Sequence, residues 1–211
     1  GPETVSEVQR KFQGTLWHTY AFFTLYADID KYDPSEYDLK KCKLSLMDKW
    51  ALSKLNTLVK RVGTMLAEYN ITDSAREIQE FSDILSNWYV RRGRDRYWGS
   101  EMTEDKAAAY TTLYTVLVTL AKLLAPYTPF MSEMMYRNLV SGFYPDAPVS
   151  VHLCDFPVCD ETAIDTELEK GMDDVLSVVV LGRAARNAGN LKNRQPLSEI
   201  VVSGERELEI S

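Results

Sequence analysis

The segment SLMDKWALSKLNTLVKRVGTMLAEY, residues 45–69, decides the fold because it carries both a helix start signal and a long apolar stripe. Ser45 stands three residues before Asp48, the spacing of a capping box, in which each side chain accepts a hydrogen bond from the other residue's backbone N–H. Apolar residues then recur at steps of three or four: Met47, Ala51, Leu55, Leu58, Val62, Leu66 and Tyr69. This spacing predicts an amphipathic helix of about 23 residues that buries one face.

Helical periodicity recurs on both sides of this segment. The predicted helices cover residues 4–27, 45–69, 73–98, 103–125, 128–140 and 166–188. The third helix begins near Asp73 or Ser74, and Ser74 has the capping-box spacing to Glu77. The fourth helix begins at Thr103 and stops before Pro126. Residues 28–37 are predicted to form a loop. Long helices with short connections predict an antiparallel helical bundle.

The C-terminal part of the chain has a mixed pattern. Val149–Leu153, Leu197–Val202 and Glu207–Ile210 are predicted as short strands, the last two around Gly204. The chain is therefore predicted to be mainly α, with a leading helix and loop over residues 3–44, the bundle over 45–147 and a small α/β appendage over 148–211. Residues 1 and 2, Gly-Pro, have the sequence of a protease-cleavage scar and are set aside.

Composition excludes several classes of protein. With 45% hydrophobic residues, the 211-residue chain can form a sizeable core, but no apolar run approaches the roughly 20 residues that span a bilayer. Cys42, Cys154 and Cys159 form no CxxC pair, which is typical of free thiols in a reducing compartment. His18 and His152 have no ligand-spaced partners, so no metal site is predicted. No phosphate loop, catalytic triad or paired carboxylates can be assembled, so no catalytic residue is predicted.

One candidate binding segment is SNWYVRRGRDRYW, residues 86–98, where two pairs of aromatic rings flank four arginines. Arginine forks match phosphate geometry and stack on flat rings, which indicates a nucleic-acid surface. The candidates are Arg91, Arg92, Arg94, Arg96 and Trp98, whereas Trp88 belongs to the core stripe. Gly93 costs about 1 kcal/mol in a helix and indicates close packing or a local break. The alternative is a brace that docks on another part of the protein.

Helical geometry divides these arginines between two faces. Arg91 and Arg94 lie on one face, and Arg92 and Arg96 lie on another. The four therefore cannot all touch one RNA strand. We expect two to contact RNA phosphates and two to hold neighbouring protein.

A second candidate segment follows the last predicted helix. From Val175 to Ile200 the cations Arg183, Arg186, Lys192 and Arg194 face a single acid, Glu199, whereas residues 155–174 are strongly acidic. These cations either meet RNA or offset the negative carbonyl end of the helix. The net charge of −7 argues against nucleic-acid binding over the whole surface, so any such site is expected to be local.

Seven stretches resemble isoleucyl-tRNA synthetases, which are class I aminoacyl-tRNA synthetases, and they occur in that family's order. They are LWHTYAFF (16–23), YADID (26–30), LMDKWALSKLN (46–56), SNWYVRRGRDRYW (86–98), LAPYTPF (124–130), SVHLCDFP (150–157) and LKNRQPL (191–197). Neither the His-Ile-Gly-His type motif nor the Lys-Met-Ser-Lys-Ser type loop of the family occurs. The resemblance thus implies a C-terminal anticodon-binding fragment of a cytoplasmic enzyme.

The resemblance also implies a function and partners. It implies a domain that positions isoleucine tRNA, tRNA(Ile), beside a catalytic domain outside this sequence, which would use ATP with Mg²⁺ to join isoleucine to the tRNA. No membrane partner is expected. Valyl- and leucyl-tRNA synthetases are the alternative families.

Overall fold

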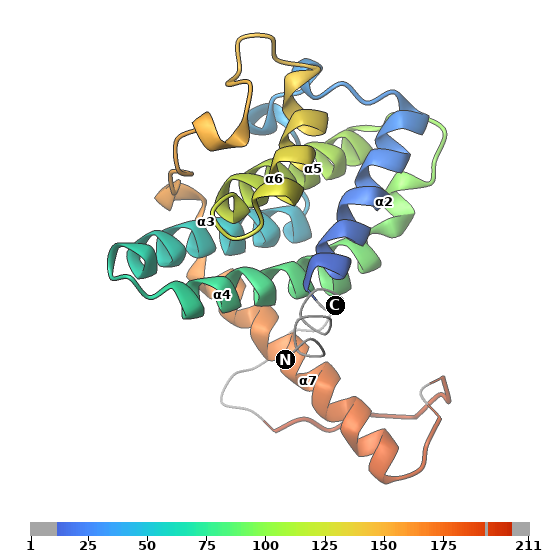
Figure 1. Cartoon of the computed structure of the whole chain (residues 1–211). Coiled ribbons are helices and arrows are strands. Elements are labelled where there is room, and N and C mark those ends of the chain that lie inside the picture. Colours follow the sequence, from blue (N-terminus) through green and yellow to red (C-terminus); the bar gives the residue numbers. More distant parts are fainter. Residues whose placement is uncertain (1–11, 193, 204–211) are drawn as a thin grey trace. The chain divides into compact units, whose positions relative to one another are not determined.

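The computed structural model describes residues 12–192 and 194–203 (Figure 1). The chain forms two compact units, Gly1–Ile164 and Asp165–Ser211. The long helices of the first unit are α2 (Gly14–Asp30), α3 (Leu46–Ala67), α4 (Ile71–Ile84), α5 (Glu104–Leu124) and α6 (Pro129–Tyr136). The π-helical segments η4 (Leu85–Val90) and η6 (Arg137–Ser141) extend α4 and α6. The prediction of a mainly α helical bundle is confirmed.

Helix α3 begins at the predicted capping box. The Ser45 N–H donates to Asp48 Oδ2 at 2.9 Å, and the Asp48 N–H donates to Ser45 Oγ at 3.2 Å. The buried face of the helix includes Trp50, Ala51, Leu55, Leu58 and Val62, and α3 packs along α4 (Figure 1). Tyr69 was wrongly included in the buried stripe, because the chain turns after Ala67 and leaves this side chain 88% exposed.

Helix α5 is the central helix of the first unit and packs against α2, α3 and α6. Thr103 caps it by accepting a hydrogen bond from the Lys106 N–H at 3.1 Å, and the helix ends at Leu124, shortly before Pro126, as predicted. The predicted stripe is fully buried: Tyr110, Leu113, Leu117, Leu120 and Leu124. By length and composition this helix would be apolar enough to cross a membrane, but 67% of its most apolar window is buried inside the structure. It is therefore the core helix of the bundle.

The third predicted helix starts earlier than expected and changes its winding. Its N-cap is Asn70, which accepts from the Asp73 N–H, so the predicted start at Asp73 or Ser74 is wrong. Ser74 Oγ instead lies 2.7 Å from the Ile71 carbonyl oxygen and 2.6 Å from Tyr127 Oη. After Ile84 the helix continues as η4 and then, beyond Gly93, as the 3₁₀ helix η5 (Arg94–Tyr97).

Gly93 marks the break before η5. A Cβ atom at this position would lie 3.0 Å from the Tyr89 carbonyl oxygen, and the Gly93 N–H donates to that same oxygen at 3.0 Å. Both a close approach and a local break are therefore present, as the cost of a helical glycine had indicated.

The leading helix and its loop also differ from the prediction. Residues 4–11 of the predicted first helix lie outside the described residues, and α2 extends to Asp30, where Lys31 in the left-handed conformation ends it. The 3₁₀ helices η2 (Pro34–Glu36) and η3 (Leu39–Lys41) interrupt the loop. They are capped by Asp33 and Asp38, which accept from the N–H groups of Ser35 and Lys40.

The predicted strand at Val149–Leu153 is wrong, because Val151–Leu153 is the 3₁₀ helix η7. Glu133 accepts from the Val151 N–H and from Ser150 Oγ, both at 2.9 Å, so a side chain occupies a donor that a strand would use. Helix η7 contacts α5 and α6, and η8 (Glu161–Ala163) contacts α3. Residues 148–164 thus belong to the first unit, whereas the predicted appendage begins at 148.

The second unit contains α7 (Thr166–Ala188), at the predicted position. Asp165 caps it by accepting from the Leu168 N–H at 2.9 Å. The predicted strand at Leu197–Val202 is wrong, because those described residues have no regular secondary structure. The predicted strand at Glu207–Ile210 lies outside the described residues.

The two threonine N-caps provide a matched test of helix capping. Thr103→Ala removes the hydrogen bond to Lys106 N–H and should lower the free energy of unfolding by about 1 kcal/mol. Thr128 holds the same position before α6 but makes no capping hydrogen bond, so Thr128→Ala should cost less. Urea unfolding followed by circular dichroism measures both. Equal losses would contradict the capping assignment.

Candidate nucleic-acid interface

The arginine-rich segment lies across η4 and η5, where buried apolar and aromatic side chains fix its backbone. Leu85, Tyr89, Val90 and Tyr97 are buried, and the Tyr97 hydroxyl donates to the Ala109 carbonyl oxygen at 3.1 Å. Helix η4 contacts α2 and α3, and η5 contacts α5. The intervening arginines are therefore presented from a backbone that is anchored to three helices.

Arg96 is turned inward and binds two carboxylates. Its Nη1 and Nη2 donate to the two oxygens of Asp48 at 2.7 and 2.8 Å, and its Nε and Nη2 donate to those of Asp105 at 2.9 and 2.8 Å. Its side chain is only 16% exposed. Such paired contacts use the planar fork of arginine fully. The structure therefore places Arg96 in an ion network that joins α3, η5 and α5.

Asp48 is the centre of this network and is completely buried. Besides Arg96, it accepts from the Tyr89 hydroxyl at 2.6 Å and from both donors of Ser45. Burial alone would raise the pKa of Asp48, but the hydrogen bonds from Arg96, Tyr89 and Ser45 outweigh burial and lower this pKa. The pKa of Tyr89 is raised by burial and by the neighbouring Tyr97 and Asp48. The aspartate therefore stays ionised and the phenol stays neutral.

A second buried ion pair holds the chain that follows η5. Lys106, 2% exposed, places Nζ at 2.7 Å from Asp30 Oδ2 and also donates to the Gly99 carbonyl oxygen. The Tyr110 hydroxyl donates to the same Asp30 oxygen. Sequence reasoning missed this pair and also the role of Asp48 beyond capping. The available signal was Lys106 itself, a cation beside the alanines of the most apolar helix.

The other candidates of this segment are exposed. Arg91, Arg92 and Arg94 make no ion pair with any carboxylate of the described residues, and Trp98 is 62% exposed. The guanidinium of Arg92 lies 5.4 Å from the Trp88 ring centroid, and that of Arg94 lies 5.8 Å from the Phe22 ring. We call Arg91, Arg92, Arg94 and Trp98 the arginine surface.

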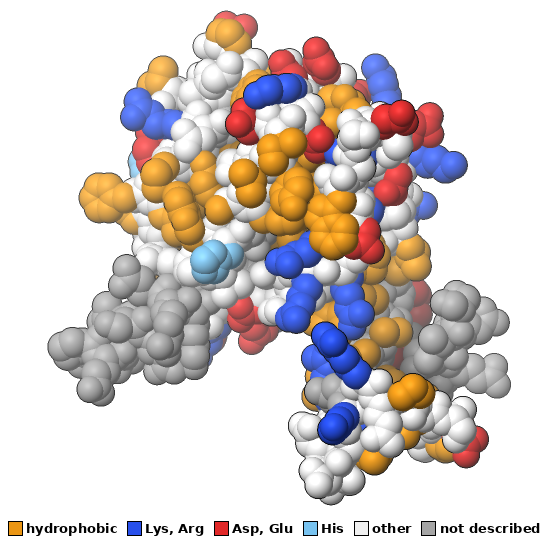
Figure 2. All heavy atoms as spheres, turned by 90° about the vertical axis from the view of Figure 1, so that its right-hand side faces the viewer, with side chains coloured by type: hydrophobic (Ala, Val, Ile, Leu, Met, Phe, Trp, Pro, Cys, Tyr) orange, Lys and Arg blue, Asp and Glu red, His pale blue; other side chains and the backbone are white. Residues whose placement is uncertain are grey.

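Figure 2 shows one face of the molecule on which apolar side chains gather, with Lys and Arg side chains along their edge. Helix α2 contributes exposed apolar side chains to the surface of the first unit, namely Leu25 and Ile29. A surface that combines cations with apolar groups can contact both phosphates and bases.

The cations of the second unit have separate surroundings. Arg183, Lys192 and Arg194 are exposed. Arg186 in the last turn of α7 donates to the carbonyl oxygens of Lys192 and Gln195, both at 2.9 Å, and so closes the loop after the helix. The structure brings Arg186 and Lys192 together through the backbone of that loop. Within the described ranges, no three His, Cys, Asp or Glu side chains are grouped to hold a metal ion.

A family model described as the anticodon-binding domain of tRNA ligase matches residues 48–201. The chain belongs to this family. It is 55% identical over 201 residues to the isoleucine–tRNA ligase of Clostridium acetobutylicum and 53% identical to that of Clostridium novyi. Each alignment covers 95% of this chain and 19% of the relative. It is also 49% identical over 200 residues to isoleucine–tRNA ligase 2 of Bacillus anthracis, an alignment that covers 94% of this chain and 18% of that relative.

The chain thus spans about one fifth of the length of the curated relatives that it matches. Residues 48–201 include all of the ion network around Arg96 except Ser45, all of the arginine surface and the cations of the second unit. The family match therefore covers every candidate binding residue.

The buried position of Arg96 predicts a large difference between two neighbouring arginines. Arg96→Gln leaves Asp48 buried without its cation and should lower the free energy of unfolding by about 3 kcal/mol. Arg92→Gln removes an exposed contact with Trp88 and should change the free energy of unfolding by no more than about 0.5 kcal/mol. Urea denaturation of both variants measures the difference. A similar small loss in both would show that the network contributes little.

The lowered pKa of Asp48 predicts a defined pH dependence. Because the folded pKa lies below the unfolded pKa of about 3.9, the stabilisation is present above that pH and is lost as the pH falls through the folded pKa. Asp48→Asn should therefore reduce the slope with which the free energy of unfolding falls as the pH is lowered. Asp146→Asn, which removes an exposed carboxylate, is the control variant. Unfolding series between pH 2 and pH 6 measure the slopes, and an unchanged slope in Asp48→Asn would contradict the assignment.

Proposed function

We propose that this chain binds the anticodon arm of tRNA(Ile) and positions that tRNA for aminoacylation. The observation that carries the proposal is the arginine surface: three exposed arginines and an exposed tryptophan, without carboxylate partners among the described residues, in a member of an anticodon-binding family. The names of the relatives, all isoleucine–tRNA ligases, favour tRNA(Ile) over the valine and leucine alternatives.

The arginine surface suits the two kinds of contact that a folded RNA arm offers. Arg91, Arg92 and Arg94 present guanidinium groups to phosphates, which give affinity without sequence preference. Trp98 presents a ring on which an unpaired loop base can stack, a contact worth about 1–3 kcal/mol. The two roles together would fix the position of the arm.

Arg96 has a different role in this proposal. Its guanidinium is occupied by Asp48 and Asp105, so we assign it to positioning the η5 backbone that presents Arg94 and Trp98. In the alternative interpretation, the arginine-rich segment is a brace that docks on another part of the protein. Arg96 has such a structural role, but it joins elements within the first unit.

Arg183, Lys192 and Arg194 are proposed as further phosphate contacts, because they are exposed and have few acids nearby in sequence. Arg186 is proposed to shape the loop that carries Lys192, through its two carbonyl contacts. A local cationic site is compatible with the net charge of −7, because the acids are concentrated elsewhere in the sequence.

For the longer protein, the names of the relatives support an isoleucine–tRNA ligase, and we propose that it acts in the cytoplasm. A catalytic domain outside this sequence would bind ATP with Mg²⁺ and form the ester with tRNA(Ile). In this proposal the residues of the present chain hold the tRNA, and none of them takes part in the chemical step.

Binding to an isoleucine-tRNA anticodon stem-loop tests the proposal. In a salt series, Arg91→Gln, Arg92→Gln and Arg94→Gln should each weaken binding and reduce the slope of log affinity against log salt by about 0.7–0.9. Arg76→Gln is the control, an exposed arginine about 20 Å away along α4 and η4 that pairs with Asp73.

The anticodon itself supplies the specificity control. A stem-loop with a changed anticodon should bind more weakly if this chain discriminates, and with equal affinity if it only positions the arm. Absence of salt-sensitive binding at low salt, or an equal loss in Arg76→Gln, would contradict the proposed surface.

A further inference from the structure

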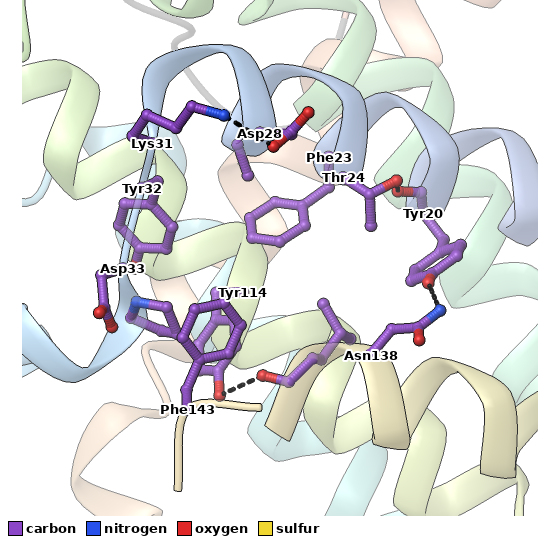
Figure 3. A pocket seen from close by; sticks show the side chains of 13 residues that line it. Tyr20, Phe23, Thr24, Asp28, Lys31, Tyr32, Asp33, Tyr114, Asn138 and Phe143 are labelled. Carbon is purple, nitrogen blue, oxygen red and sulfur yellow. Dashed lines mark hydrogen bonds and ion pairs between the residues drawn. The ribbon is translucent and has the colours of Figure 1, made fainter. Parts of the chain in front are cut away.

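The first unit contains a cavity of about 560 Å³ that lies away from the arginine-rich segment. Its walls come from α2, residues 31–34, α5, η6 and Phe143 (Figure 3). This volume is within the range of about 300–1,000 Å³ typical of small-molecule sites. No residue of the arginine surface lines it, so it is independent of the proposed tRNA contacts.

The walls of the cavity are aromatic and held in place. Tyr20, Phe23, Tyr32, Tyr114 and Phe143 contribute rings, and the Phe23 centroid lies 6.2 Å from those of Tyr32 and Tyr114. The Tyr114 hydroxyl donates to the Leu139 carbonyl oxygen at 3.1 Å (Figure 3). Burial raises the pKa of Tyr114, so its hydroxyl stays neutral. The cavity therefore offers preformed, uncharged π surfaces.

The opening of the cavity carries an excess of negative charge. Asp28 and Asp33 line it together with one cation, Lys31, whose Nζ lies 3.1 Å from Asp28. Asp33 makes no ion pair with the described residues. Its Oδ1 accepts from Ser35 N and Oγ at 2.9 and 2.6 Å, and these hydrogen bonds lower its pKa and keep it ionised. One carboxylate is therefore left without a cation.

A further polar group lies at the opposite end of the cavity from Asp33 (Figure 3). The Asn138 side-chain nitrogen donates to the Tyr20 hydroxyl at 2.7 Å, and this contact directs the amide on the wall of the cavity (Figure 3). The amide carbonyl oxygen accepts no hydrogen bond from the described residues. Aromatic faces attract cations, and carboxylate and amide oxygens accept from N–H groups.

We propose that this cavity binds a small planar organic cation, one that carries an amidinium or guanidinium group. The flat body of the ligand packs against the rings, and its N–H groups face the Asp33 carboxylate at one end of the cavity. This binding site goes beyond the proposed tRNA function and does not depend on it. It assigns a role to residues that neither the tRNA contacts nor the ion network uses.

Three probes of the same shape and different charge test the proposal. Benzamidinium, benzamide and benzoate are titrated into the protein by isothermal calorimetry. Benzamidinium should bind with a dissociation constant on the order of 1 mM, benzamide about tenfold more weakly, and benzoate not detectably. Equal binding of benzamide and benzamidinium, tighter binding of benzoate, or no binding of benzamidinium at about 10 mM would overturn the proposal.

A matched pair of variants locates the binding. Asp33→Asn keeps an oxygen acceptor for the η2 cap but removes the charge, and should weaken benzamidinium binding about two- to fivefold. Asp38→Asn makes the same change at the η3 cap, outside the cavity, and should leave the affinity unchanged. An unchanged affinity in Asp33→Asn, or equal losses in both, would overturn the assignment. Binding of the anticodon stem-loop should be unaffected by Asp33→Asn, so the two proposals fail separately.

Discussion

The buried pairing of Arg96 with Asp48 is the interaction on which the arginine-rich segment depends. Asp48 is fully buried, and its charge is stabilised by Arg96, Tyr89 and the Ser45 cap together. Removing one partner would leave an uncompensated charge in the core, which is far more costly than losing an exposed ion pair. This network fixes η5 against α3 and α5, and thereby fixes the backbone from which Arg94 and Trp98 extend.

The same segment therefore combines two functions of arginine. The guanidinium of Arg96 donates hydrogen bonds to two carboxylates of its own chain, whereas Arg91, Arg92 and Arg94 are exposed to solvent. The four arginines do not form one patch, because Arg96 is turned into the ion network whereas Arg91, Arg92 and Arg94 are exposed. A chain with a net charge of −7 can in this way support a local cationic surface.

The sequence predicted the helices well because capping and apolar spacing are local properties. Ser45, Thr103 and the limits of α7 were found in this way. The sequence could not predict that Arg96 pairs with Asp48, which lies 48 residues away along the chain. The strand at Val149–Leu153 was predicted wrongly for a similar reason, because Glu133, remote in sequence, occupies the Val151 N–H. Side-chain contacts across the fold decided both cases.

The central claim, that Arg91, Arg92 and Arg94 contact tRNA while Arg96 braces the fold, can be observed directly. Arginine Nε–H resonances are recorded by ¹⁵N NMR, assigned by substitution, while the isoleucine-tRNA anticodon stem-loop is added. The account predicts shifts for the three exposed arginines and an unchanged, exchange-protected signal for Arg96. A shifted Arg96 signal with unchanged exposed arginines would contradict it.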